Sequence, residues 1–281
     1  MVIFKRIADL QAYLGGQKQQ GKAVGFVPTM GALHQGHISL VSGGKKAGNI
    51  VVCSIFVNPT QFNDKEDFEK YPITISEDTA LLIKAGCDVL FLPSVDEMYP
   101  NGTSEPPRYD LGYLDTILEA AHRPGHFKGV AQIVAKLLDA VQPDKLYMGQ
   151  KDYQQCMVIR KMIEIDNRSV EMLTCPTQRE DDGLAMSSRN RRLTEPQRAL
   201  AGIIYQCLVS IQTKRGNTDF EVVRKECIDL MNHKGLEPDY VEIANSDTLE
   251  VSANYIPGKN MVALIAARIG NVRLIDNMLL Q

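Results

Sequence analysis

The sequence predicts an α/β protein with a Rossmann-like parallel sheet domain and a smaller C-terminal α+β domain. Short apolar runs rich in β-branched residues alternate with longer amphipathic segments over residues 22–177, as they do where crossover helices join parallel strands. From about Thr194, two helical patterns come before two strand-like ones, which is the order of an α+β unit. We therefore expect domains at residues 1–177 and 178–281, with residues 178–192 as a loop beside the hinge.

Each element of this prediction has its own pattern. Apolar runs bounded by polar residues, Gly or Pro predict buried strands at residues 22–28, 49–57, 87–93, 144–149 and 170–177. Amphipathic periodicity predicts helices between them at residues 76–85, 129–141 and 152–166. In the second domain the expected helices are residues 195–214 and 219–233, and the expected strands are residues 239–244 and 261–269.

Composition bounds the function. The 281 residues are 44% hydrophobic and 23% charged, as in ordinary globular proteins, and the net charge of −3 argues against a basic surface for nucleic acid or an anionic membrane. No apolar run approaches the ~18 residues of a membrane span, and no signal peptide is expected at the start. Six cysteines without a CxxC pair predict neither disulfides nor a thiolate zinc site. A cytoplasmic protein without nucleic-acid or membrane partners is expected.

One phosphate-loop pattern is rejected. Residues 16–23 nearly match GxxxxGK[ST], but Ala23 has no hydroxyl for Mg²⁺, and the run precedes a strand where it should follow one. An ordinary turn is expected there.

The informative segment is PTMGALHQGH at residues 28–37, directly after the first core strand. Gly31 and Gly36 permit close backbone approach, and the helix that follows presents free N–H groups and the positive end of its dipole to an anion. His34 and His37 share a helix face and could donate hydrogen bonds to phosphate oxygens. The alternative is a pair of capping or core histidines. Zinc is disfavoured because the pair supplies only two ligands.

Two further segments predict phosphate contacts. Lys151 follows the strand at residues 144–149, where ligands of open α/β sheets bind, although a polar helix cap is an equal alternative. In the loop at residues 178–192, Arg189 offers a planar charged fork beside two serine hydroxyls, and Gly183 is expected to make the loop deformable. A solvated basic loop is the alternative there.

Neutral polar groups complete the candidate site. Asn58 and Gln61 follow the second strand and could bind a small polar molecule. Residues 122–129 contain His-x3-His, but Pro124 and Gly125 make this a loop at the edge of the site, not a helical metal motif.

These motifs together resemble a known family. PTMGALHQGH resembles the HxGH phosphate motif of the adenylate-forming and nucleotidyl-transferring superfamily, and LAMSSRN at residues 184–190 resembles the counterpart of the Lys-Met-Ser-Lys-Ser loop. With FVNPTQF, HRPGHFKGVAQIVAKLL, GQKDYQQ and RLIDN, the set resembles the pantoate–β-alanine ligase family over essentially the whole chain. The resemblance implies ATP-dependent condensation of pantoate with β-alanine through a pantoyl adenylate, with Mg²⁺, release of AMP and pyrophosphate, and a homodimer.

The resemblance also implies roles for residues of this sequence. The expected catalytic residues are His34, His37, Lys151 and Arg189, with His37 as proton donor. The expected ATP contacts are Met30, Gly31, Ala32, Leu33, His34, Gln35, Gly36, His37, Gly149, Gln150, Lys151, Asp152, Gln178, Met186, Ser187, Ser188 and Arg189. The expected contacts to pantoate or β-alanine are Asn58, Gln61 and Gln155. Asp78, next to Glu77, is expected near the Mg²⁺ that the ATP phosphates carry.

The sequence departs from the family at two places. Gln178 stands where many members have valine, which a backbone contact to adenine would tolerate. Gly43 and Gly44 fall inside the helix after His37, where each is expected to destabilise the helix by ~1 kcal/mol relative to Ala.

Two other functions stay open from the sequence. A nucleotidylyltransferase that keeps AMP in its product would share the histidine motif, but it has no need of the paired Gln61 and Gln155. A non-catalytic nucleotide-binding module would have no need of His34, His37, Lys151 and Arg189 together.

Overall fold

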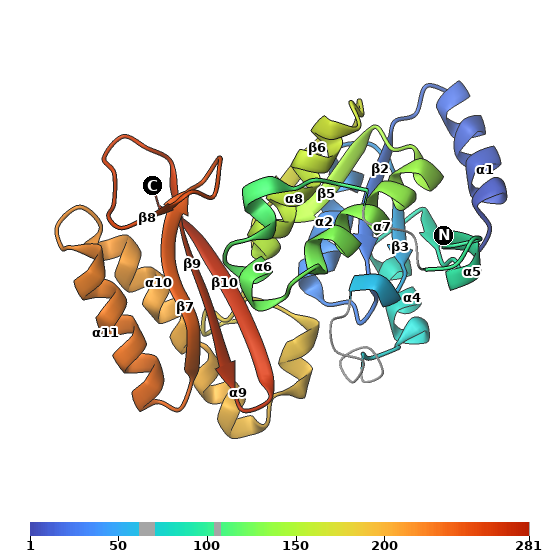
Figure 1. The fold of residues 1–281 in the computed structure, drawn as a ribbon. Coiled ribbons are helices and arrows are strands. Elements are labelled where there is room, and N and C mark those ends of the chain that lie inside the picture. Colours follow the sequence, from blue (N-terminus) through green and yellow to red (C-terminus); the bar gives the residue numbers. More distant parts are fainter. Residues whose placement is uncertain (62–70, 104–107, 281) are drawn as a thin grey trace. The chain divides into compact units, whose positions relative to one another are not determined.

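Figure 1 shows the computed structural model, which describes residues 1–61, 71–103 and 108–280. Phe62 of the FVNPTQF segment lies outside the described residues. By contacts, the chain divides into one unit of residues 1–149 with 154–175 and a second of residues 150–153 with 176–281. The expected boundary after residue 177 differs from this by two residues and by the turn at residues 150–153, which the sequence assigned to the first domain.

The first unit is built on a parallel six-stranded sheet of order β1-β4-β3-β2-β5-β6. Its strands are β1 Val2–Phe4, β2 Val24–Thr29, β3 Ile50–Ile55, β4 Val89–Phe91, β5 Lys145–Gly149 and β6 Glu171–Cys175. Its longer helices are α1 Ile7–Gln19, α2 Gln35–Lys46, α4 Ile75–Lys84, α7 His126–Val141 and α8 Tyr153–Ile165. The five strands predicted for this domain are all present. The three-residue edge strand β1 was not predicted.

Successive residues of each strand feed two separate cores. Phe26 packs into a cluster with residues of α1, α7 and α8, whereas its neighbour Val27 packs into a cluster with residues of α2 and α4. Because side chains alternate between the faces of a sheet, helices on both sides bury most residues of the central strands. This is why the strands are continuous apolar runs in the sequence.

The strand order reverses between β2 and β5. The β2–β3 ladder runs as far as Thr29 and Ile55, but the β2–β5 ladder runs only through Gly25 and Phe26. Pro28, which has no N–H group to donate, follows on β2. Ligands of open α/β sheets bind beyond the carboxyl ends of the strands at such a reversal. The segment at residues 29–37 begins there.

The second unit has an antiparallel sheet of order β10-β9-β7-β8. Its strands are β7 Glu237–Asn245, β8 Val251–Ser252, β9 Met261–Ile269 and β10 Val272–Leu280, and its helices are α9 Glu195–Ala201, α10 Ile203–Lys214 and α11 Phe220–His233. Helices α10 and α11 and the sheet share one apolar core. The predicted helix at residues 195–214 is two helices separated at Gly202. The predicted fold class, a parallel Rossmann-like sheet with a smaller α+β domain, is confirmed.

Gly44 has a packing reason to be in the middle of α2. A Cβ there would lie 2.8 Å from Val51 Cγ2 and 3.4 Å from Tyr147 Cε2, whereas a Cβ on Gly43 would meet nothing closer than Tyr147 Cε1 at 4.0 Å. Only the second of the two glycines is therefore required by the packing of α2 on the sheet.

We expect Gly44→Ala to lower the free energy of unfolding by about 1–3 kcal/mol, since the added methyl group overpacks the helix against the sheet. Gly43→Ala is the matched control in the same helix and should raise it by about 0.5–1 kcal/mol through helix propensity. Urea denaturation of both variants measures the difference. Equal effects of the two substitutions would contradict this account of Gly44.

Candidate active site

The segment after β2 turns through two residues with left-handed backbone. Gly31 has φ +83° and Ala32 has φ +49°. A Cβ on Gly31 would lie 3.1 Å from each of two neighbouring side-chain atoms, so a glycine is needed for space as well as for conformation. The Thr29 hydroxyl donates to the Ser54 carbonyl oxygen at 2.7 Å and accepts from the Gly31 N–H at 3.1 Å. The path of the segment out of the sheet is thus fixed.

Asp78, in the first turn of α4, holds the next two residues. Its carboxylate is 1% exposed and accepts from the N–H groups of Ala32 at 2.9 Å and Leu33 at 2.8 Å. These two N–H groups therefore point to a carboxylate, and the expected contact of Ala32 and Leu33 with ATP gains no support from them. The expected place of Asp78 near Mg²⁺ gains none either. Across the described residues, no three His, Cys, Asp or Glu side chains gather as a metal site requires.

His34 and His37 cap the N-terminus of α2. The Nδ1 of His34 accepts from the Gly36 N–H at 3.1 Å, and the Nδ1 of His37 accepts from the His34 N–H at 3.3 Å. The two rings lie 4.1 Å apart between centroids, at 43°. Because an imidazole nitrogen that accepts carries no proton, the neutral ring bears its proton on Nε2. The capping interpretation is confirmed, and it fixes each Nε2 as a donor.

The first polar segment beyond β3 forms a buried network. Asn58 is 1% exposed, and its Oδ1 accepts from the Tyr99 hydroxyl at 2.8 Å. Its Nδ2 donates to Gln61 Oε1 at 3.3 Å and to the Gly129 carbonyl oxygen at 3.4 Å, and Gln61 Nε2 lies 2.6 Å from Met30 Sδ. The structure therefore brings together Asn58, Gln61 and Met30, which the sequence placed in the site. Asn58 is engaged inside the protein and orients Gln61.

His126, for which no role was predicted, bonds the backbone of Gln61. Arg123 NH1 lies 3.0 Å from His126 Nε2, and since a guanidinium only donates, Nε2 accepts and Nδ1 donates to the Gln61 carbonyl oxygen at 2.8 Å. The short helix α6, Glu119–His122, ends before Pro124, and α7 begins at His126. Residues 123–125 therefore interrupt the His-x3-His pattern, as expected, but α7 begins three residues earlier than predicted.

The two glutamines at the start of α8 differ in role. Gln154 is 3% exposed, and its amide is bonded to three backbone groups: the Glu119 N–H at 2.9 Å and the carbonyl oxygens of Leu114 at 2.9 Å and Ile117 at 3.0 Å. Gln155 is half-buried and lies ~100° further around the helix. Gln154 is thus structural, and Gln155 stays the predicted substrate contact.

In the second unit, the turn that carries Lys151 is held by β10. Asn277 Nδ2 donates to the carbonyl oxygens of Gln150 at 3.0 Å and Lys151 at 2.8 Å, and its Oδ1 accepts from Gln150 Nε2 at 3.2 Å. Lys151 Nζ lies 3.6 Å from Asp152 Oδ1. Asn277 is the last residue of the RLIDN segment named above, but no role was predicted for it.

The segment at residues 178–186 is a tight hairpin. The Met186 N–H donates to the Gln178 carbonyl oxygen at 2.9 Å, and Arg179 pairs with Ala185 in an isolated bridge. A Cβ on Gly183, which has φ +87°, would lie 2.0 Å from Tyr205 Cδ1. The glycine is needed for close packing on this ring, and the deformability expected of the loop stays a prediction.

Ser187 and Ser188 follow the hairpin directly. Ser187 Oγ accepts from the Arg189 N–H at 3.2 Å at the start of the short helix η4, Ser188–Arg192. Arg189 is half-buried. Ser187, Ser188 and Arg189 thus lie in a defined turn, and the choice between a phosphate-binding segment and a solvated basic one stays untested.

The expected ATP contacts divide between the units. Those at residues 30–37 and Gly149 belong to the first unit, and those at residues 150–152, Gln178 and residues 186–189 belong to the second. Within the second unit, β10 contacts both the turn at residues 150–152 and the short helix η4. That both sets contact one ATP molecule stays a prediction.

Comparisons with known proteins cover the whole chain. The family model for pantoate-beta-alanine ligase matches residues 2–279. The pantothenate synthetase of Cytophaga hutchinsonii is 46% identical over 283 residues, which cover 100% of this chain and 99% of that protein. The pantothenate synthetase of Acetivibrio thermocellus is 45% identical, with 100% of both chains covered.

Solved structures agree with this. A pantothenate synthetase from Thermus thermophilus has a TM-score of 0.90 at 39% identity, with 99% of both chains covered. A pantoate-beta-alanine ligase from Francisella tularensis, complexed with beta-gamma ATP and beta-alanine, has a TM-score of 0.82 at 36% identity, with 99% of this chain and 97% of that one covered. In the described ranges, no helix combines the length and apolar character that crossing a bilayer demands.

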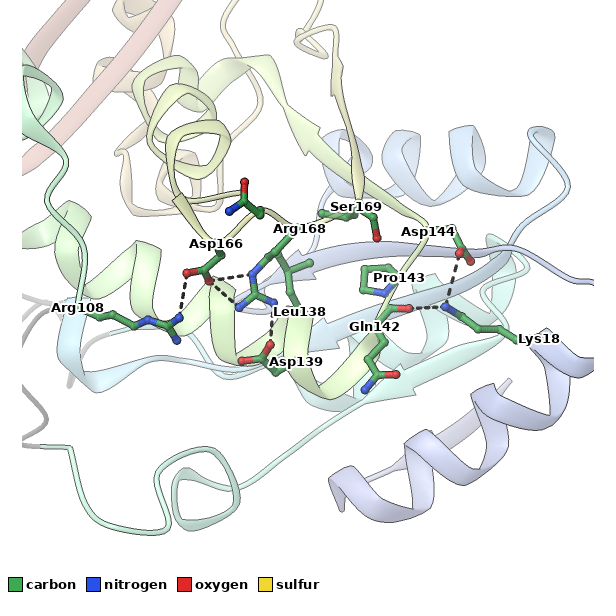
Figure 2. A pocket seen from close by; sticks show the side chains of 12 residues that line it. Lys18, Arg108, Leu138, Asp139, Gln142, Pro143, Asp144, Asp166, Arg168 and Ser169 are labelled. Atoms are coloured by element: carbon green, nitrogen blue, oxygen red, sulfur yellow. Dashed lines mark hydrogen bonds and ion pairs between the residues drawn. The ribbon is translucent and has the colours of Figure 1, made fainter. Parts of the chain in front are cut away.

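A polar pocket of about 680 Å³ lies in the first unit (Figure 2). Several of its residues directly precede β5 and β6, so it is at the amino ends of these strands, whereas residues 29–37 are at the carboxyl end of β2. Arg168 lies between Asp139 and Asp166, with NH1 2.7 Å from Asp139 Oδ1 and NH2 2.8 Å from Asp166 Oδ2. Lys18 pairs with Asp144 at 3.5 Å. The cations that line this pocket are thus already neutralised by its own carboxylates, unlike those of an anion site.

Asp166 accepts hydrogen bonds from three side chains, one of which is Arg168. Its carboxylate also accepts from the Tyr109 hydroxyl at 2.8 Å and from Arg108 NH2 at 2.9 Å. Burial raises the pKa of the Asp166 carboxyl, but the bonds from Tyr109 and Arg168 outweigh burial and leave that pKa below its usual value. Burial and the bond to Asp166 raise the pKa of Tyr109 to about 12.

We expect Asp166→Asn to lower the free energy of unfolding by about 2 kcal/mol at pH 7, because the charged acceptor of several partly buried hydrogen bonds is lost. A lowered folded-state pKa gives stability that is present above the unfolded value near 4 and is lost as pH falls below it, so the difference from wild type should shrink there. Urea denaturation of wild type and variant, at pH 7 and at a pH below about 4, measures the two differences in free energy. The Asp139 side chain is 62% exposed, so Asp139→Asn should lower the free energy of unfolding by at most about 1 kcal/mol. A loss that does not change with pH would contradict the role of the carboxylate charge.

Proposed function

The chain belongs to the pantoate-beta-alanine ligase family, and from this membership we infer that it joins pantoate to β-alanine in an ATP-dependent reaction. The observation that carries the inference is the match of residues 2–279 to the family model, together with relatives at 44–46% identity over nearly their whole length. The histidine pair at the N-terminus of α2 and the buried amides of Asn58 and Gln61 support it from the geometry.

The chemistry needs an activated acid. A carboxylate is a poor acylating agent, because its leaving group would be oxide. In the first step a pantoate carboxylate oxygen bonds to the α-phosphorus of ATP, and the bond from that phosphorus to the bridging oxygen breaks, which releases pyrophosphate. In the second step the β-alanine nitrogen bonds to the acyl carbon, the carbon–oxygen bond to AMP breaks, and the amine loses a proton. Positioning and charge stabilisation do most of the catalytic work in such reactions.

His34 and His37 are assigned to the ATP phosphates. The cap bonds leave the proton of each neutral ring on Nε2, so each ring is a hydrogen-bond donor of fixed tautomer. A donor of this kind stabilises negative charge that grows on phosphate oxygens as pyrophosphate leaves. The positive end of the dipole at the start of α2 acts in the same sense.

Lys151, Ser187, Ser188 and Arg189 are assigned to the same nucleotide. Lys151 brings a compact positive charge, and Arg189 brings a planar fork that suits phosphate oxygens. The hydroxyls of Ser187 and Ser188 add neutral donors. The Gln178 backbone is assigned to adenine, and Gly149, Gln150 and Asp152 are assigned to the nucleotide beside Lys151.

Pantoate is assigned to Gln61 and Gln155, with Met30 as an apolar neighbour. Gln61 is held by Asn58 at its side chain and by His126 at its carbonyl oxygen, so its amide is oriented before substrate binds. Neutral amides bind a carboxylate and hydroxyls without lowering the nucleophilicity of the acid as a close cation would. This is the polar pattern expected for a small hydroxy acid.

Mg²⁺ is assigned to the ATP phosphates and not to a protein cage. Mg²⁺ keeps several waters and is commonly held by one or two carboxylates plus substrate phosphates, which suits a site where Asp78 already accepts two backbone N–H groups. Bound in this way, the ion would neutralise charge on the phosphates. Glu77, the exposed carboxylate next to Asp78, is the alternative protein ligand. A homodimer and a cytoplasmic location remain expectations of the resemblance.

We expect the protein to exchange labelled pyrophosphate into ATP when pantoate is present and β-alanine is absent, because adenylation is reversible and precedes amide formation. Exchange should fall to background without pantoate. Exchange at the same rate without pantoate would contradict the ligase and favour a nucleotidylyltransferase of another acceptor.

We expect His34→Asn to separate the two roles of this histidine. Asparagine is a preferred N-cap residue and should keep the bond to the Gly36 N–H, so the melting temperature should stay near that of wild type. It lacks the Nε2 donor, so pantoate-dependent exchange should fall on the order of 10²-fold. His233→Ala, at the exposed end of α11, is the control and should leave both measurements unchanged. Wild-type exchange in His34→Asn would show that His34 is only a cap.

A further inference from the structure

Two consecutive polar residues are buried in the middle of β10. Asp276 is 4% exposed and Asn277 is 2% exposed, in a strand whose other buried residues are apolar. Consecutive residues of a strand point to opposite faces of its sheet. Asp276 shares its face with Leu274 and Leu280, which pack into the core of the second unit, and Asn277 points to the other face.

Asp276 fixes the hairpin that comes before Ser187–Arg189. Arg179 forms a two-pronged pair with it, with NH1 to Oδ2 at 2.5 Å and NH2 to Oδ1 at 3.1 Å. The same guanidinium donates to the Gly183 carbonyl oxygen at 3.0 Å and lies 4.5 Å from the centroid of the Tyr205 ring. One buried carboxylate thereby holds Arg179, and Arg179 pairs with Ala185 across the hairpin.

Asn277 fixes the turn that carries Lys151. All three of its side-chain bonds described above go to this turn: two donated to the carbonyl oxygens of Gln150 and Lys151, and one accepted from the Gln150 side chain. Both carbonyl groups that flank the Cα of Lys151 along the chain are thus anchored to the strand. The anchored Cα sets where the ammonium group of Lys151 can reach.

We propose that Asp276 and Asn277 are positioning residues for adenylation, and that β10 acts as a common support for the two phosphate-binding segments of the second unit. The proposal rests on the proposed function, which assigns Lys151 and Ser187–Arg189 to ATP. A triphosphate can be bound at several oxygens only if its partners keep a constant separation, and a shared strand provides that constancy. In this proposal neither residue contacts ATP: Asp276 acts through Arg179 and its hairpin, and Asn277 acts through Lys151.

The sharpest test is a double-mutant cycle of Asn277 with Lys151. Pantoate-dependent pyrophosphate exchange is measured as kcat and as KM for ATP in wild type, Asn277→Ala, Lys151→Ala and the double variant. Lys151→Ala should lower kcat on the order of 10²-fold and Asn277→Ala on the order of 10-fold. If Asn277 acts through Lys151, adding Asn277→Ala to Lys151→Ala should cause almost no further loss.

Independent losses that multiply in the double variant would overturn the role of Asn277 in placing Lys151. A wild-type rate in Asn277→Ala would overturn it as well. If Asn277→Ala does not fold, Asn277→Ser, which keeps a small polar group, replaces it in the same double-mutant cycle. Asn245→Ala is the matched control: this asparagine is on β7 of the same sheet, and its Oδ1 accepts from the N–H groups of Asp247 and Thr248. It should stay within about twofold of wild type, because it anchors no phosphate-binding segment.

The role of Asp276 is tested with Asp276→Asn in wild-type and Arg189→Ala backgrounds. We expect a loss on the order of 10-fold in kcat/KM for ATP that largely disappears when Arg189 is absent. Because the lone charge of Arg179 could unfold this variant, Asp276→Asn with Arg179→Gln keeps a neutral hydrogen-bonding pair. Full activity in either folded variant would overturn the role of Asp276. Asp239→Asn, which removes a partner of Arg273 and Arg268 in the same sheet, is the control and should stay near wild type.

These outcomes separate the inference from the function on which it rests. If wild type shows no pantoate-dependent exchange, the proposed function fails. If wild type exchanges and the cycles show independent losses, the function stands and only the positioning roles fail.

Discussion

The early end of the β2–β5 ladder is the constraint from which the first half of the candidate site follows. After Phe26 the two strands no longer pair, and Pro28 cannot donate a hydrogen bond toward a neighbour. The chain that leaves β2 here therefore needs other partners, and Thr29 and Asp78 supply them. Parallel strands end at the same edge, so the segment beyond β3 with Gln61 begins beside this turn.

The fold could be predicted from the sequence where a strand is long and buried on both of its faces. The runs that became β2, β3 and β5 are continuous apolar stretches because helices cover both faces of the sheet. β1 was not predicted because three half-exposed residues of an edge strand are too few to show a strand periodicity. β10 was missed because Asp276 and Asn277 interrupt its apolar run, although Gly270 before Asn271 between two apolar segments is a hairpin signal.

The site was predictable where one local motif carried it. His34 and His37 were found from their spacing, and the cap that they form is also a local interaction. The partners that orient the site come from far along the chain: Asp78 bonds Ala32 across 46 positions, His126 bonds Gln61 across 65, and Asn277 bonds Gln150 across 127. No spacing rule connects such residues, because only the tertiary fold sets these distances.

The anchor of Lys151 by Asn277 has a consequence for how the protein is made. A ribosome adds roughly 5–20 residues per second, so the turn at residue 150 leaves the ribosome about ten seconds before its anchor exists. During that interval the parallel sheet can assemble, but the lysine turn has no strand to hold its carbonyl groups. The turn at residues 150–152 therefore lacks the side-chain bonds that fix its carbonyl groups until the hairpin of β9 and β10 has been synthesised.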